Sequence, residues 1–176
     1  MKTIHLVTPT ETHEAECLSF LDACKISTSE IAGTAGLERM PYLDWLKKIA
    51  QSEAGLDLPT DRVPATTRLG YYGNELIGII NIRHTLNPFL EHAGGHIGYM
   101  VHPKKRRLGM ATAMLAAGLK LAKETLNLNC VLVTCSPENI GSKKTILNNG
   151  GVYENTVHDT QLGPVERYWI DLKGRF

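Results

Sequence analysis

Residues 101–112, which read VHPKKRRLGMAT, are the stretch of sequence that decides the fold. An apolar run typical of a strand, residues 94–101, stops at Pro103, and a helical pattern runs from Arg107 to about Thr125. The first turn of a helix has backbone N–H groups without internal partners, at the positive end of the helix dipole. Gly109 in that turn lets a ligand approach closely, because glycine has no Cβ. The stretch therefore predicts an anion site that holds a phosphate-bearing ligand.

Four basic residues flank this turn: Lys104, Lys105, Arg106 and Arg107. The whole chain has 19 Lys and Arg against 18 Asp and Glu, a formal net charge of +1, so the basic cluster is local. A local cluster favours a small anionic ligand over a long polyanion. We expect Arg106 or Arg107 to contact phosphate and the two lysines to face solvent. A nucleic-acid-binding module is the less favoured alternative, since no aromatic platform surrounds the cluster.

The composition indicates one domain over residues 1–176, because 43% of the residues are apolar and can fill a sizeable core. No run of about 18 apolar residues predicts a membrane span. The first residues, MKTIHLVTPTETHEAE, lack the apolar region of a signal peptide, so we expect a cytoplasmic protein. The four cysteines lie in stretches that read as helix or strand, which predicts reduced, buried thiols: Cys17, Cys24, Cys130 and Cys135.

Hydrophobic periodicity predicts an α/β protein with a mixed, mostly antiparallel sheet. A hairpin is expected at Gly73-Asn74, and its second strand is rich in Ile and therefore central. The strand at 130–135 completes a β-α-β unit, so it should run parallel to the strand at 94–101. The expected strands are residues 3–7, 66–72, 75–84, 94–101, 130–135, 152–157 and 166–172, and the expected helices start near residue 12 and cover 42–52, 107–125 and 139–149.

Two motifs resemble those of the GNAT acyl-CoA N-acyltransferases. Residues 106–111, RRLGMA, fit the pattern Gln/Arg-x-x-Gly-x-Gly/Ala, and residues 139–142, NIGS, fit the Asn-x-x-Ala/Ser helix of that family. The order of elements also follows the GNAT fold over nearly the whole chain, and residues 65–176 carry the cofactor-binding core. The stretches NIRH (81–84), GGHIGYMV (94–101), TCSPEN (134–139) and RYWI (167–170) resemble a bacterial subgroup of predicted acetyltransferases.

The resemblance implies acetyl-CoA as cosubstrate, bound where two neighbouring parallel strands separate at their C-terminal ends. The pantetheine arm would pair with free backbone groups like an added strand, and the pyrophosphate would rest on the N–H groups at the helix start. The residues implied for binding are Met100, Val101, Arg106, Arg107, Leu108, Gly109, Met110, Ala111, Thr112 and Asn139.

The candidate catalytic residues are His96, His84 and Tyr99. The acceptor amine must lose a proton before it attacks, and histidine is a base suited to neutral pH. Strict alternation along the strand turns the side chain of His96 away from the face of residues 95, 97, 99 and 101, unless a bulge intervenes. A structural role therefore stays open for His96, and it also stays open for His84. Many GNAT enzymes have Tyr seven residues after the motif asparagine, where Ile146 stands here. Tyr99, Tyr153 or solvent would then protonate the departing thiolate.

Two other chemistries are disfavoured. Cys135 is expected to be a buried strand thiol, because the family transfers its acyl group directly. His92 and His96 have the spacing of a metal pair on a helix, but Gly94-Gly95 interrupts any helix between them, so no metal is expected.

We therefore predict an acetyl-CoA-dependent N-acetyltransferase that acts on a primary amine of a small-molecule or peptide acceptor, without a nucleic-acid or membrane partner. The main alternative is a non-catalytic acyl-CoA binding or sensing domain, motivated by Ile146. The acceptor is left open, and the segments 26–64 and 86–95 are expected to shape its site. The sequence also leaves a homodimer open.

Overall fold

The computed structural model describes residues 2–27 and 31–175, and contains two antiparallel sheets. The first sheet has the strand order β1-β2-β3-β4 and the second has the order β5-β7-β6. The strands are β1 His5–Val7, β2 Ala65–Tyr72, β3 Glu75–Arg83, β4 Ile97–Val101, β5 Cys130–Cys135, β6 Val152–Asp159 and β7 Gly163–Asp171. The helices are α1 Glu14–Ile26, α2 Tyr42–Ala54, α3 Met110–Glu124 and α4 Ile140–Asn148. Short helical turns occur at Glu11–His13, Leu37–Arg39, Leu90–Gly94 and Pro103–Lys105.

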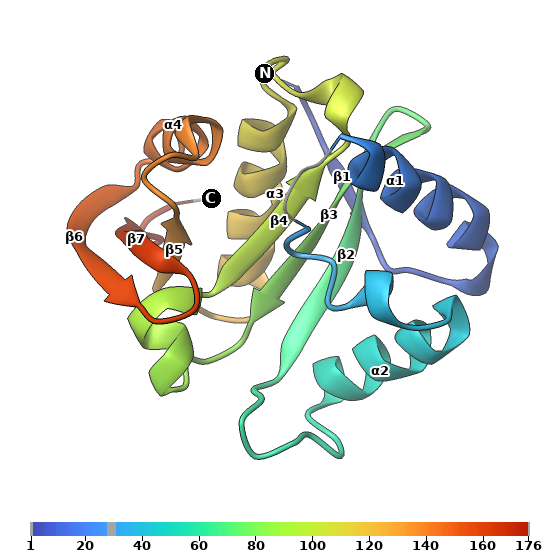
Figure 1. Ribbon diagram of the computed structural model, residues 1–176, viewed down its shortest axis with the longest axis horizontal. Coiled ribbons are helices and arrows are strands. Elements are labelled where there is room, and N and C mark those ends of the chain that lie inside the picture. Colours follow the sequence, from blue (N-terminus) through green and yellow to red (C-terminus); the bar gives the residue numbers. More distant parts are fainter. Residues whose placement is uncertain (1, 28–30, 176) are drawn as a thin grey trace.

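The helices cover both faces of the first sheet, as Figure 1 shows. One apolar core lies between this sheet and α3, and includes Ile80 and Ile82. The other lies between the sheet and the helices α1 and α2, and includes Ile79 and Met100. Every residue of β3 from Leu76 to Ile82 is buried, which confirms the prediction of a central strand. Burying one such side chain contributes about 1.5–3 kcal/mol, so β3 anchors both layers.

The predicted hairpin is confirmed. Strands β2 and β3 pair antiparallel, with Tyr72 opposite Glu75, and Gly73 takes a φ of +60° in the turn. The predicted closing pair is also confirmed, since β6 and β7 run antiparallel. The prediction for the third helix was three residues too long at its start. Residues Pro103–Lys105 form a separate turn and Arg107 has a φ of +59°, so α3 begins at Met110.

Strands β4 and β5 lie side by side without forming a ladder, and they belong to different sheets. The backbone N–H of His96 donates to the carbonyl oxygen of Leu132 at 2.7 Å. Within the described residues no other backbone hydrogen bond joins the two strands. The expected parallel pairing is therefore limited to this one contact. From there toward Val101 and Cys135 the described strands share no backbone hydrogen bond, and this unpaired stretch is called the strand gap below.

Strand β4 is shorter than expected because the chain ahead of it is coiled. Residues Leu90–Gly94 form a π-helical turn, and Gly95 follows with a φ of +65°. All four cysteines are free, but Cys130 is exposed, so the prediction of buried thiols was wrong for this residue. Within the described residues, no helix has the length and apolarity needed to cross a bilayer.

Candidate active site

The turn before α3 has the geometry of an anion site. Gly109 is the N-cap of α3 with a φ of +75°, and a Cβ placed on it would meet no atom within 4 Å. The N–H of Ala113 donates to the Gly109 carbonyl at 3.1 Å and closes the first helical turn. The N–H groups of Met110, Ala111 and Thr112 precede that bond and point out of the helix end. The space above Gly109 is therefore open to a ligand that accepts several hydrogen bonds.

The basic residues around this turn differ in their partners. Lys105 forms an ion pair with Glu75 at 2.6 Å, and the Nε of Arg106 donates to the Val101 carbonyl at 3.4 Å. Lys2 donates to the Leu108 carbonyl at 2.6 Å, which fixes the turn from the other side. Arg107 is exposed and makes no hydrogen bond or ion pair to residues 2–27 or 31–175. Among the described residues, the side chains of Lys104 and Arg107 are thus both exposed and without a hydrogen bond or ion pair.

The register of β3 and β4 decides which backbone groups of β4 face the strand gap. His102 donates to the Ile77 carbonyl and Arg83 donates to the His96 carbonyl, both at 2.8 Å. Because hydrogen-bonded pairs alternate in an antiparallel ladder, the backbone groups of Met100 point toward β3. Those of Tyr99 and Val101 point into the gap. Tyr99 and Val101, rather than Met100, can therefore pair with an extended ligand.

Tyr99 and α4 meet at the C-terminal end of this gap. The hydroxyl of Tyr99 lies 3.1 Å from the Oγ of Ser142, and burial raises the pKa of this phenol, so it is protonated at neutral pH. Asn139 is confirmed as the N-cap of α4, because its Oδ1 accepts the N–H of Ser142 at 3.0 Å. Ile146 is fully buried in the core.

The two candidate histidines are engaged in structural contacts. His96 is 7% exposed, and its Nδ1 accepts the backbone N–H of Leu132 at 2.9 Å. Burial, together with the charge of Arg83, lowers the pKa of His96 to about 4, so the ring is neutral at pH 7. The Nε2 of His84 lies 2.9 Å from the Oγ1 of Thr66 in β2, and burial lowers its pKa. These contacts favour positioning roles, whereas Tyr99 has its hydroxyl at the gap.

Gly33, which precedes α2, lies against the other face of β4. Gly33 has a φ of +71°, and a Cβ on it would stand 2.4 Å from the backbone nitrogen of Tyr99 and 2.5 Å from the carbonyl of Gly98. Only glycine allows the chain to pass so close to this peptide group. Residues 28–30 of the expected acceptor segment lie outside the described residues.

Arg83 lies at the end of β3 on the same face and was missed by the sequence reasoning. Its Nη1 donates to the carbonyls of Gly94 and Gly95, each at 3.2 Å. The signal was an arginine at the end of a buried apolar run, ELIGIINIR.

Cys135 sits at the end of β5 but is not activated. Burial is the main cause that raises its thiol pKa to about 11, and the neighbouring Glu166 carboxylate adds to the effect. Glu166 itself is satisfied by Lys143 at 2.9 Å and by the hydroxyl of Tyr168 at 2.5 Å. A thiol with this pKa is a poor nucleophile at neutral pH. Among residues 2–27 and 31–175, no group of three or more His, Cys, Asp or Glu side chains is arranged to hold a metal ion.

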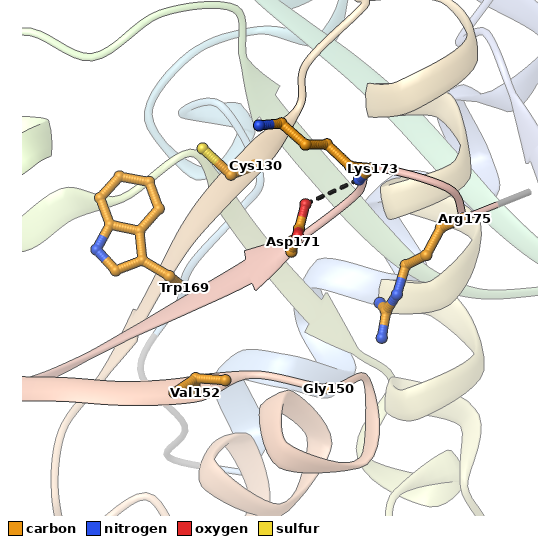
Figure 2. A pocket seen from close by; sticks show the side chains of 7 residues that line it. All are labelled: Cys130, Gly150, Val152, Trp169, Asp171, Lys173 and Arg175. Atoms are coloured by element: carbon orange, nitrogen blue, oxygen red, sulfur yellow. Dashed lines mark hydrogen bonds between the residues drawn. The ribbon is translucent and has the colours of Figure 1, made fainter.

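One cavity lies away from these groups. It has a volume of about 650 Å³ and is lined by Cys130, Trp169 and Lys173 among others, at the opposite end of β5 from Cys135. Figure 2 shows these side chains around a wide hollow, where the Oδ1 of Asp171 accepts the backbone N–H of Lys173. The hollow contains neither the open turn before α3 nor the strand gap, so it is not the candidate active site.

The comparisons with known proteins agree with this arrangement. A family profile described as "Acetyltransferase (GNAT) domain" matches residues 22–152. The chain belongs to the GNAT acetyltransferase family, because this match covers most of its length. No curated protein matches the sequence.

Solved structures with a similar fold are acetyltransferases. A probable acetyltransferase has a TM-score of 0.72 at 16% identity, with coverage of 98% of this chain and 95% of that chain. The RimL ribosomal L7/L12 α-N-protein acetyltransferase, in complex with coenzyme A, has a TM-score of 0.68 at 16% identity, with coverage of 97% and 95%. A chimera of the Vibrio cholerae spermidine N-acetyltransferase with hSSAT has a TM-score of 0.66 at 12% identity, with coverage of 97% and 96%. These identities show a common fold.

Proposed function

We propose that this chain is an acetyl-CoA-dependent N-acetyltransferase that acetylates a primary amine by direct transfer. The observation that carries the proposal is the strand gap, which begins after the single His96–Leu132 backbone contact and lies next to the open turn at Gly109. Family membership and the coenzyme A complex of the similar RimL fold support acetyl-CoA as the cosubstrate. One domain over residues 1–176 is proposed, with 65–176 forming the cofactor-binding part. The free cysteines support a reducing compartment, the cytoplasm.

The proposed cosubstrate site follows the geometry of β4 and α3. The pyrophosphate accepts hydrogen bonds from the N–H groups of residues 108–112 and meets the guanidinium of Arg107, whereas Arg106 supports the turn through Val101. The pantetheine arm pairs with the backbone groups of Tyr99 and Val101. Asn139 caps α4 through its Oδ1, which leaves its side-chain N–H groups to face the same arm.

The proposed reaction needs a neutral amine, an oxyanion stabiliser and an acid. The amine nitrogen attacks the thioester carbon, and the carbonyl oxygen takes the negative charge. A backbone N–H of β4 that points into the gap stabilises this oxygen, and one such donor contributes about 2.7–4 kcal/mol in comparable sites. When the carbon–sulfur bond breaks, the Tyr99 hydroxyl donates its proton to the thiolate, supported by Ser142 at 3.1 Å. The attacking nitrogen, which carries two protons after attack, releases one of them to water and keeps the other as the amide N–H. The Tyr99 phenolate then regains a proton from solvent.

The second candidate function is acyl-CoA binding without turnover. It is favoured by Ile146, which is buried where many family members have a tyrosine. The two functions are separated by mixing the protein with acetyl-CoA and a panel of primary amines and measuring thiol release and acetylated product. Product formation above the rate of spontaneous hydrolysis supports the enzyme. Saturable acetyl-CoA binding without product from any amine would favour the sensing domain.

A further inference from the structure

Arg83 carries a charge that the described protein does not neutralise. The partly buried Arg68 pairs with Glu53 at 2.6 Å, and Arg167 pairs with Glu154 at 3.0 Å. No carboxylate among residues 2–27 and 31–175 lies within ion-pair distance of Arg83. Its Nη1 contacts only the carbonyls of Gly94 and Gly95, and its Nε and Nη2 make no hydrogen bond within these residues.

The surroundings of Arg83 are unfavourable for a lone cation. Burial, together with the charge of Arg62, lowers the pKa of the guanidinium to about 10, so the group is still charged at neutral pH. The charge of Arg83 in turn helps to lower the pKa of His96. The Arg83 side chain is half-buried, and its unpartnered nitrogens are still reached by solvent, so an anion can approach them. A partly desolvated charge without a partner is unfavourable, and an anion that binds it reduces that cost.

Arg83 also lies on the face of β4 that is opposite to α3. Its Nη1 is 3.8 Å from the position that a Cβ on Gly98 would take, and Gly33 lies 3.2 Å from the same position. Gly98 shares a face of β4 with Met100, which packs against α1 and α2, whereas α3 and the proposed cosubstrate site lie on the opposite side. The centroid of the His96 ring lies 6.3 Å from the centroid of the Trp169 ring in the second sheet.

We infer that Arg83 binds a carboxylate of the acceptor, so that the substrate class is amines that also carry a carboxylate. This inference rests on the proposed acetyltransferase function. Two nitrogens of the planar guanidinium, Nε and Nη2, have no hydrogen-bond partner among the described residues, and their N–H groups form a fork that matches the two oxygens of a carboxylate. A polyamine would bring a second positive charge toward Arg83 and is disfavoured by repulsion.

The experiment compares acceptors that differ only in this charge. Acetyl transfer is measured for L-amino acids against their carboxamides, for short peptides with Glu against Gln, and for spermidine. The wild-type protein should favour the carboxylate member of a pair by about tenfold to a hundredfold in kcat/KM, as expected for a charged hydrogen-bonded pair. Comparing free amino acids with acidic peptides shows whether the carboxylate belongs to a free amino acid or to a peptide.

Variants assign the preference to Arg83. R83M keeps the length of the side chain without the charge and should erase the carboxylate preference, mainly through KM. R83K should retain part of it, because lysine keeps the charge but loses the fork. R62Q is the matched control, since Arg62 is exposed and contributes only a distant charge to Arg83. Thermal unfolding and acetyl-CoA binding should match the wild type in R62Q.

Two results would overturn the inference. One is a wild-type protein that acetylates carboxamides or spermidine as efficiently as the carboxylates, and the other is a carboxylate preference that survives in R83M.

Calorimetric titration of the coenzyme A complex with N-acetylglycine and with N-acetylglycinamide tests the role of Arg83 independently of turnover. Binding of N-acetylglycine alone supports the role of Arg83, and equal or absent binding of both refutes it. A wild type without thiol release from any amine instead contradicts the proposed function.

Discussion

His96 and Leu132 are joined by two hydrogen bonds that link the two sheets where the strand gap begins. The N–H of His96 donates to the carbonyl of Leu132 at 2.7 Å, and the N–H of Leu132 donates to the Nδ1 of His96 at 2.9 Å. Since Nδ1 is an acceptor, the ring proton sits on Nε2. His96 therefore fixes the point from which β4 and β5 separate.

Protein stability should fall in acid because of this ring. The folded-state pKa of His96, about 4, is below the unfolded value of 6.5, so the unfolded chain takes up a proton first. The stabilisation is fully present above pH 6.5 and is lost as the pH falls from 6.5 to about 4, by up to about 3 kcal/mol. His96→Asn keeps an acceptor near Nδ1 and does not titrate. Urea unfolding at pH 7 and pH 4.5 should show a smaller pH effect in the variant, and an equal effect would refute this assignment.

Tyr99→Phe tests the proposed acid. The variant lacks the hydroxyl that lies 3.1 Å from Ser142, and kcat should fall about a hundredfold, within the usual range for general acid catalysis. Acetyl-CoA affinity should stay unchanged, because the backbone of β4 is intact. Tyr153→Phe is the control, since the Tyr153 hydroxyl contacts Thr156 on β6 at 2.8 Å. Equal kcat values for Tyr99→Phe and the wild type would mean that another group or water protonates the thiolate.

Asn139 combines a structural role with a proposed ligand contact, and two substitutions separate them. Asn139→Ala removes the cap on Ser142 and should lower the free energy of unfolding by about 1 kcal/mol. Asn139→Asp keeps the acceptor oxygen and should retain stability, but it lacks the side-chain N–H donor. Denaturant unfolding and acetyl-CoA titration are measured on both variants. A fully stable Asn139→Ala variant would contradict the capping role.

Local sequence patterns predicted most of the fold, because the turns, buried strands and helix caps that they indicate are determined by residues close together in the sequence. The Gly73-Asn74 turn, the buried β3 and the cap at Asn139 depend on neighbours in the sequence, and all three are confirmed. The glycine at the start of α3 was readable for the same reason, since an open helix start needs only a glycine and its flanking residues.

The remaining features depend on contacts between segments that are distant in the sequence. The π-helical turn ahead of β4 reorients His96, and its partner Leu132 comes from the next sheet. The approach of Gly33 to the peptide of Tyr99 and the unpaired charge of Arg83 also arise only in the folded chain. No periodicity in the sequence encodes such relationships, so the surroundings of Gly33 and Arg83 were the least predictable part of the structure.

The most direct test of the proposed function is acetyl-CoA binding at Gly109, measured by calorimetry. Gly109→Glu places a carboxylate in the open space above the N-terminus of α3, and Gly109→Gln places a neutral side chain of the same size there, with the same backbone strain. We predict saturable binding to the wild type, a loss of about tenfold or more in Gly109→Glu, and a clearly smaller loss in Gly109→Gln. Equal affinity of the wild type and Gly109→Glu would contradict the proposal that this turn holds the pyrophosphate.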